Sequence, residues 1–177
     1  LLLYPDEKTR TERILLLGLG KEADFNLRQL RRAAAEAVRA AEATPATKIG
    51  FCIPVCKAID DEAVGQALAE GAILASYRFD RYRSEPRPGR RHLKQVMVAA
   101  GGSPLRQVDA GLARGETLAN ATNFARDLVN EPAAVKTPTY LATLAKQLGK
   151  EAGIEVEVWD PKRIAAIGYC FGGTAVL

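Results

Sequence analysis

The sequence has 177 residues, of which 47% are hydrophobic and 26% are charged, and this balance is typical of a folded globular chain rather than a disordered one. No apolar run approaches the roughly 18–20 residues that a membrane-spanning helix needs, so we expect no membrane partner. The net charge of +4 comes from one segment, Arg78–Lys94, whose seven cations and two anions give +5, while the rest of the chain sums to −1. The basic character is therefore local and does not indicate a general affinity for nucleic acid.

The first part of the chain alternates predicted strands with predicted helices. The continuous apolar run Arg13–Leu17 predicts a buried strand. Asp24 is the expected N-cap of an amphipathic helix whose apolar residues recur every three to four positions until Pro45. Ile49–Ile53 predicts a second buried strand, and the acidic triplet Asp60–Glu62 begins a further helix, where negative charge favours the first turn.

The middle of the chain contains a basic loop, a strand and a long helix. Arg78–Arg91 is polar and contains proline, which predicts a loop or hairpin. Gln95–Ala99 predicts a third strand. The apolar spacing from Leu105 to Asn130 predicts one long helix, which Pro132 ends because proline disfavours helical backbone before it.

A helix and a strand are predicted for residues 137–159. Thr137 is the expected N-cap of a helix with Pro138 at its first position, and the helix continues to Gly153. Ile154–Trp159 alternates strictly between apolar and polar residues, which predicts a half-buried strand. Strands alternating with helices indicate an α/β fold, a layered and largely parallel sheet with flanking helices.

The chemistry open to this chain is limited by its cysteines and its single histidine. Cys52, Cys56 and Cys170 are an odd number without a secretory signal, so we expect no disulfides and a cytoplasmic, reducing setting. A zinc site made with His92 is not favoured, because Cys52 and Cys56 are close in sequence whereas the other two candidates are far away. Because the sequence starts without Met and ends abruptly, we expect a fragment of a longer protein.

A glycine motif follows the first predicted strand. Gly18–Ala23 fits G-x-G-x-x-A, whose glycines can let the backbone approach a pyrophosphate. The second predicted strand, however, ends in Cys52-Ile53-Pro54 with no acid to hold a ribose, and no Ser or Thr follows Lys21 as in a P-loop. We therefore interpret the motif as a strand-to-helix turn and assign no cofactor-binding residue.

The composition of the basic segment suggests nucleic-acid binding as an alternative function. Tyr77, Phe79 and Tyr82 alternate with arginines in and beside Arg78–Arg91, so the segment could stack on bases and neutralise phosphates. A solvated loop with its aromatic residues packed on the core is the favoured interpretation, and a nucleic-acid-binding module is kept as an alternative.

A second alternative comes from the end of the chain. Gly168–Gly173, with the sequence GYCFGG, resembles the nucleophile elbow of the dienelactone hydrolase family, with Cys170 as the nucleophile. Such an enzyme needs an acid and a histidine after the nucleophile, but only seven residues follow Cys170, and His92 lies in the basic segment. We predict that Cys170 is not catalytic, and a truncated Cys-nucleophile hydrolase remains the alternative.

Other segments resemble one family over most of the chain. Gly115–Ala142, which reads GETLANATNFARDLVNEPAAVKTPTYLA, resembles the opening of the catalytic domain of the leucyl aminopeptidases (cytosol aminopeptidase family, M17). Glu12–Lys21 and Glu70–Glu85 resemble the N-terminal α/β domain of that family. Together these segments cover roughly residues 10–163.

The resemblance implies a fold and an activity. It implies an N-terminal, macro-like α/β domain over residues 1–110 and the truncated start of a catalytic α/β domain over residues 111–177. The family comprises cytoplasmic, hexameric metallopeptidases that remove N-terminal residues from peptides with two divalent metals, Mn or Zn. Its metal ligands lie beyond the end of this chain, so we assign no catalytic, cofactor-binding or metal residue here and expect the chain alone to be inactive.

Overall fold

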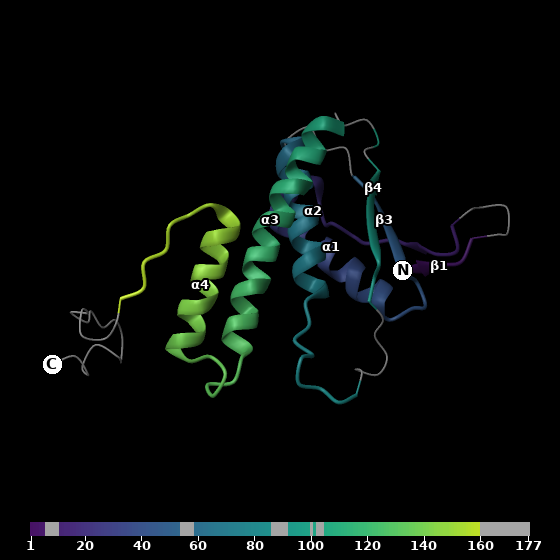
Figure 1. Cartoon of the computed structure of the whole chain (residues 1–177). Coiled ribbons are helices and arrows are strands. Elements are labelled where there is room, and N and C mark those ends of the chain that lie inside the picture. Colours follow the sequence, from purple (N-terminus) through teal and green to yellow (C-terminus); the bar gives the residue numbers. More distant parts are fainter. Residues whose placement is uncertain (6–10, 54–58, 86–91, 100, 102–104, 160–177) are drawn as a thin grey trace. The chain divides into compact units, whose positions relative to one another are not determined.

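The structure is a computed structural model that describes residues 1–5, 11–53, 59–85, 92–99, 101 and 105–159 (Figure 1). Contacts along the chain define two compact units, Leu1–Asn130 and Glu131–Leu177, and each unit is described by itself. The division into an N-terminal domain of residues 1–110 and a catalytic segment of residues 111–177 stays a prediction.

The first unit combines short strands with three long helices among its described residues. In chain order these elements are β1 (Leu2–Leu3), β2 (Ile14–Leu15), the 3₁₀ helix η1 (Glu22–Asp24), α1 (Leu27–Glu42), β3 (Lys48–Cys52), α2 (Asp61–Ser76), β4 (Gln95–Ala99) and α3 (Leu105–Asn130). β3 and β4 pair in parallel, with Ile49 opposite Val96 and Phe51 opposite Val98, whereas β1 and β2 form a separate antiparallel pair. The mixed α/β fold with helices flanking a small sheet is the predicted class.

Two of the predicted buried strands are shorter or more exposed than expected. The run Arg13–Leu17 forms a strand only at Ile14–Leu15, and Leu16 and Leu17 are 53% and 38% exposed. The prediction of a buried strand is wrong here because, within the described ranges, β2 pairs with the two residues of β1 and not with the β3–β4 sheet. A short apolar run predicts a strand but not the strands with which it will pair.

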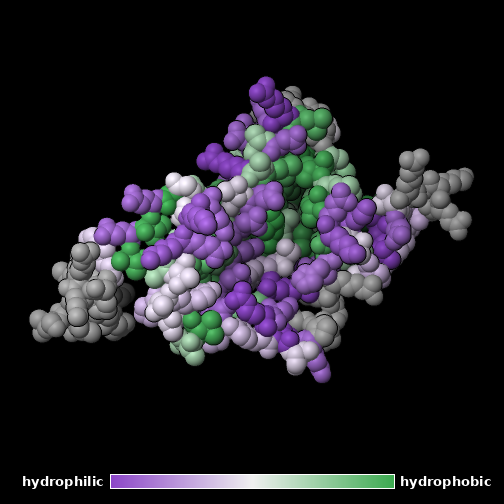
Figure 2. Space-filling model, in the orientation of Figure 1, coloured by the Kyte–Doolittle hydropathy of each residue, from purple (hydrophilic) through white to green (hydrophobic). Residues whose placement is uncertain are grey.

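β3 is half-buried rather than buried. Ile49 and Phe51 are half-buried, while Lys48, Gly50 and Cys52 between them are exposed. This alternation follows from a two-stranded sheet in which one face packs on the helical core, to which Phe51 and Val98 belong. On the neighbouring strand Val96 and Met97 are also exposed, and Figure 2 shows hydrophobic residues at the surface where β4 lies.

Side-chain caps fix the N-termini of α1 and α2, and the cap of α1 differs from the predicted one. Asp60 caps α2 by accepting a hydrogen bond from the Ala63 amide at 3.0 Å, as predicted. The N-cap of α1 is Asn26 and not Asp24, because Asn26 and Gln29 bond each other's backbone amides in a capping box. Asp24 instead ends η1. The reciprocal pair satisfies two free amides at once, which a single aspartate does not.

The buried core of the first unit is formed by α1, α2, α3 and Ile53, which follows β3, and α2 contacts both α1 and α3. A Cβ atom on Gly65 would lie 2.3 Å from the Val108 carbonyl oxygen, and one on Gly111 would lie 1.9 Å from the Glu62 carbonyl oxygen. A Cβ on Gly115 would meet the Gln66 carbonyl oxygen at 2.5 Å. α2 and α3 therefore touch backbone to backbone, which only glycine permits at these positions.

The second unit contains α4 (Pro138–Ala152), which has the predicted ends. Thr137 accepts a hydrogen bond from the Tyr140 amide at 3.2 Å, and Gly153 ends the helix with a φ of 68°. The predicted strand Ile154–Trp159 is absent: Ile154 is 65% and Trp159 56% exposed, and no described strand pairs with them. The chain instead folds back on the helix end, where the Ile154 amide donates to the Gly149 carbonyl at 2.8 Å.

The glycine contact between α2 and α3 gives a stability prediction. Gly111→Ala adds about 1 kcal/mol of helix propensity, but its Cβ would overlap the backbone of α2, and such overpacking costs about 1–3 kcal/mol or more. The 1.9 Å approach to a backbone oxygen puts the cost at the upper end of that range, so we expect a net loss of about 1–2 kcal/mol in urea denaturation. Gly50→Ala, where nothing lies within 4 Å of the new Cβ, is the control and should be neutral or stabilising by up to about 1 kcal/mol. Equal midpoints for Gly111→Ala and wild type would contradict the close contact.

Candidate functional site at the ends of α2 and α3

The chemically reactive residue types do not converge in the described part of the chain. Among those residues, no group of three or more His, Cys, Asp or Glu side chains is arranged to hold a metal ion. His92 and Cys52 are both exposed. The elbow around Cys170 lies outside the described residues. No helix in the described ranges is both long and apolar enough to span a membrane.

The glycine motif is a turn, as interpreted from the sequence. Gly18–Ala23 connects β2 to η1, and Gly20 has a φ of 84°, a conformation that favours glycine. α1 begins only at Leu27, capped by Asn26. The glycine amides are therefore not at the N-terminus of a long helix, which is where a pyrophosphate would bind.

A polar cluster joins the residue that follows α2 to the last turn of α3. The Tyr77 hydroxyl donates to Asp127 Oδ1 at 2.8 Å and accepts a hydrogen bond from Asn130 Nδ2 at 3.0 Å. The Arg126 guanidinium lies 5.5 Å from the centre of the Tyr77 ring, within the range of a cation–π contact. One half-buried aromatic side chain thus contacts three residues of the same helix turn.

The same stretch of α3 caps the C-terminal end of α2. The last carbonyls of a helix have no partner within the helix. Asn123 Nδ2 donates to the Ile73 carbonyl at 3.4 Å, and Arg126 Nη1 donates to the Leu74 carbonyl at 3.2 Å. Arg126 Nη1 also donates to Asn123 Oδ1 at 3.1 Å, which holds the two side chains together. The Ser76 hydroxyl at the end of α2 also donates to the Ile73 carbonyl, at 3.0 Å. Side chains of α2 and α3 therefore cap the end of α2 together.

The next residue, Arg78, pairs with a buried acid on α1. Glu42 is the last residue of α1 and is 1% exposed, and Arg78 Nη2 lies 2.9 Å from its Oε2 atom. Neither oxygen of Glu42 accepts a well-directed hydrogen bond from the described residues. The guanidinium charge is therefore the compensation for burying this carboxylate, and removing one partner of such a pair typically costs about 3–5 kcal/mol.

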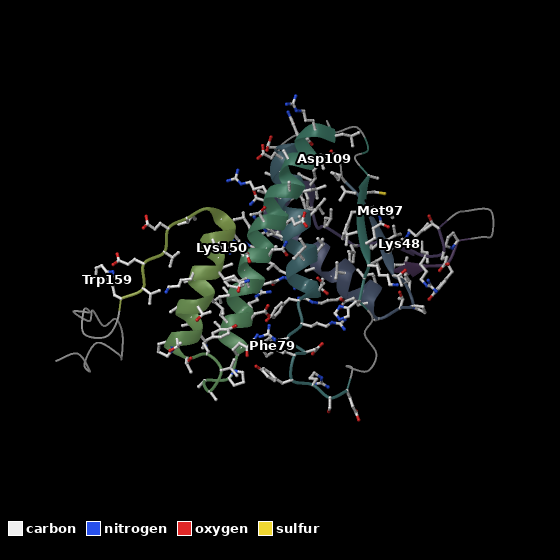
Figure 3. All side chains as sticks on the ribbon, in the orientation of Figure 1. Lys48, Phe79, Met97, Asp109, Lys150 and Trp159 are labelled. Carbon is white, nitrogen blue, oxygen red and sulfur yellow. The ribbon has the colours of Figure 1, made fainter. Side chains whose placement is uncertain are left out.

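The described part of the basic loop is partly packed and partly exposed. Asp80 accepts a backbone hydrogen bond from the Arg83 amide at 3.0 Å, which forms a turn. The rings of Phe79 and Tyr82 contact each other with centroids 5.9 Å apart, yet Tyr82 is 55% exposed. Figure 3 shows Phe79 on this loop. Tyr77 and Phe79 are half-buried, and Tyr77 lies against the polar turn of α3 rather than in the hydrophobic core. The expectation that these aromatic residues pack on the core is wrong for Tyr82, which is exposed.

Both segments of this cluster stand out in the sequence, but their contact does not. Glu70–Glu85 and Gly115–Ala142 carry the family resemblance, and they supply Tyr77 and its partners Arg126, Asp127 and Asn130. Glu42 was not singled out, because nothing in its position at a helix end distinguishes it from an exposed acid. The shared resemblance of both segments was the signal that could have suggested a contact.

These features define the first unit as an α/β domain that ends with a long helix, α3, and is followed in the sequence by a second unit. Residues 1–86 match the family described as the cytosol aminopeptidase family, N-terminal domain. The probable cytosol aminopeptidases of Roseiflexus castenholzii and Alkaliphilus oremlandii are 36% and 34% identical, over 98% and 95% of this chain but 35% and 34% of their own lengths. The chain belongs to the cytosol aminopeptidase family, and it spans about a third of the length of these relatives.

Solved structures agree with the fold. The bottromycin maturation enzyme BotP in complex with Mn has a TM-score of 0.71 and 34% identity, covering 86% of this chain and 30% of that one. A tomato leucine aminopeptidase mutant has a TM-score of 0.70 at 24% identity, covering 85% and 30%, and shows the fold alone. Neither the truncated Cys170 hydrolase nor the nucleic-acid-binding module finds support in these matches. Arg78, moreover, is buried against Glu42 and not presented to a ligand.

The Tyr77 cluster gives a pH prediction. Burial, and then the hydrogen bond to Asp127, raise the pKa of Tyr77 above its ordinary value of 10.0. The folded state therefore favours the neutral phenol, so its contribution to stability is complete below about pH 10 and is lost as the pH rises through the folded pKa. Tyr77→Phe should lower stability by about 1 kcal/mol near neutral pH and should flatten the alkaline decline.

The measurement is urea denaturation near neutral pH and in alkali. Tyr82→Phe is the matched control, because that ring is 55% exposed and contacts the Phe79 ring of the same loop. A Tyr77→Phe profile parallel to that of wild type through the alkaline range would show that this phenol does not titrate differently in the folded state.

Proposed function

We propose that this chain is the architectural N-terminal part of a metallo-exopeptidase that removes N-terminal residues from peptides. The single observation that carries the proposal is the bonding of the Arg126–Asn130 turn to the end of α2. That turn lies in the segment that resembles the opening of the catalytic domain. Its polar residues are engaged by the N-terminal domain, which suits a role in positioning rather than in chemistry.

The metal chemistry of such an enzyme belongs to residues other than those described. A two-metal hydrolase needs a dense set of carboxylates to fix both ions and the attacking water. The described residues contain no such group, so they do not fit the metal centre and no catalytic step is assigned to them. For the whole enzyme we propose two divalent ions, and manganese over zinc, because the related BotP structure is described as a complex with Mn.

Further properties of the whole enzyme follow from the family. We propose a cytoplasmic homohexamer that acts on peptides, with an N-terminal domain over residues 1–110 and the catalytic domain beginning at residue 111. The name cytosol aminopeptidase for the relatives supports the location. Within the whole enzyme, the first domain would shape access and assembly, and α3 would join it to the catalytic domain.

The isolated chain should not hydrolyse leucine p-nitroanilide with added Mn or Zn. The residues that the structure describes contain no carboxylate cluster that could hold two ions at the spacing that hydrolysis requires. The measurement is turnover by the purified chain over a range of metal concentrations. Turnover that a chelator abolishes and that co-purifies with the chain would overturn this expectation.

A chimera tests the proposed role directly. This chain would replace the matching third of the Roseiflexus castenholzii relative, and the same relative without that third is the matched control. We expect Mn-dependent hydrolysis of leucine p-nitroanilide by the chimera and none by the truncated control. A chimera that folds and assembles but stays inactive, beside an active parent, would contradict the proposal.

A further inference from the structure

Two consecutive residues at the end of α2 bind two different helices. Tyr77 bonds Asp127 and Asn130 on α3, and Arg78 pairs with Glu42 on α1. Tyr77 has backbone close to polyproline II, with φ −59° and ψ 132°, and with three residues per turn successive side chains of such backbone point in different directions. The end of α2 is thereby attached on both sides within one dipeptide.

We propose that Tyr77 and Arg78 form a two-sided clamp that makes the order of the last turn of α3 depend on the buried Glu42–Arg78 pair. α1 and α3 each pack mainly on α2. Any influence of Glu42 on Asp127 must therefore pass through α2 or through the residues at its end. Among these residues, the Tyr77–Arg78 peptide is the shortest covalent connection between the two partners.

The buried acid makes the clamp stiff on the α1 side. Glu42 lies at the C-terminus of α1, where the helix carries partial negative charge and does not favour a carboxylate. Its described surroundings offer no well-directed hydrogen bond. Arg78 therefore cannot move away without leaving a buried charge uncompensated. This requirement fixes the backbone at Arg78 and, one residue earlier, the position of the Tyr77 ring.

On the α3 side the clamp holds the turn that leads out of the first unit. The Tyr77 hydroxyl joins Asp127 and Asn130, which are neighbours on the helix surface at a spacing of three residues. Asn130 is the last residue of α3, where helices fray most readily. Any effect of this turn on a following catalytic domain rests on the proposed function, whereas the clamp itself does not.

The test is amide hydrogen exchange on the full chain, followed residue by residue. Glu42→Gln keeps the shape of the side chain but removes its charge, so it should raise exchange at Arg126–Asn130 about tenfold over any change in the middle of α3, the size expected for energetically linked residues. Glu36→Gln is the matched control, because Glu36 is an exposed acid on the same helix whose partner is Arg39. It should leave Arg126–Asn130 unchanged.

Two further variants separate the clamp from a general loss of stability. In a Tyr77→Phe background, Glu42→Gln should no longer change exchange at Arg126–Asn130 selectively, because the connection is already broken. Glu42→Leu combined with Arg78→Met replaces the buried pair with apolar side chains, which commonly preserves folding, and it should still raise exchange at this turn. Exchange that rises uniformly along the chain, or not at all, in both Glu42 variants would overturn the proposal.

Discussion

The structure of the first unit depends on the approach of α2 to α3 at backbone distance. Gly65, Gly111 and Gly115 leave no space in which a Cβ could sit, so the two helices meet through main-chain atoms along their length. This contact sets Asn123, Arg126 and Asp127 beside the final carbonyls of α2 and beside Tyr77. With larger residues at the crossing, the helices would separate and the polar bonds at their ends could not reach.

Polar bonds at the end of α2 add to the backbone contact that the glycines allow between α2 and α3. α3 provides donors to the Ile73 and Leu74 carbonyls near the end of α2, and Tyr77 and Arg78 attach the end of α2 to α3 and α1. Under the proposed function, the contribution of this chain to an aminopeptidase is architectural. Its helices hold the Arg126–Asn130 turn in place, and the metal chemistry is assigned to other parts of the enzyme.

Local signals in the sequence were sufficient for much of this fold. Asp60, Thr137 and Gly153 marked helix ends correctly, and β4 and α3 span the predicted residues. The strand predictions at Arg13–Leu17 and Ile154–Trp159 were wrong in extent or altogether, because a strand exists only with a partner that periodicity cannot supply. The Glu42–Arg78 pair and the bonds of Tyr77 to residues 50 and 53 positions away could not be predicted, since they depend on how α1, α2 and α3 pack.

The most direct measurement of the central claim is the nuclear Overhauser effect between α protons across the α2–α3 contact. The site of a Cβ on Gly115 lies 3.0 Å from the Cα of Gln66, so the account predicts a clear cross-peak between the α protons of these two residues. Helices separated by ordinary side chains, about 8–10 Å between their axes, do not bring α protons so close. The absence of this cross-peak in the folded chain, with both resonances assigned, would contradict the backbone contact on which the rest of the structure depends.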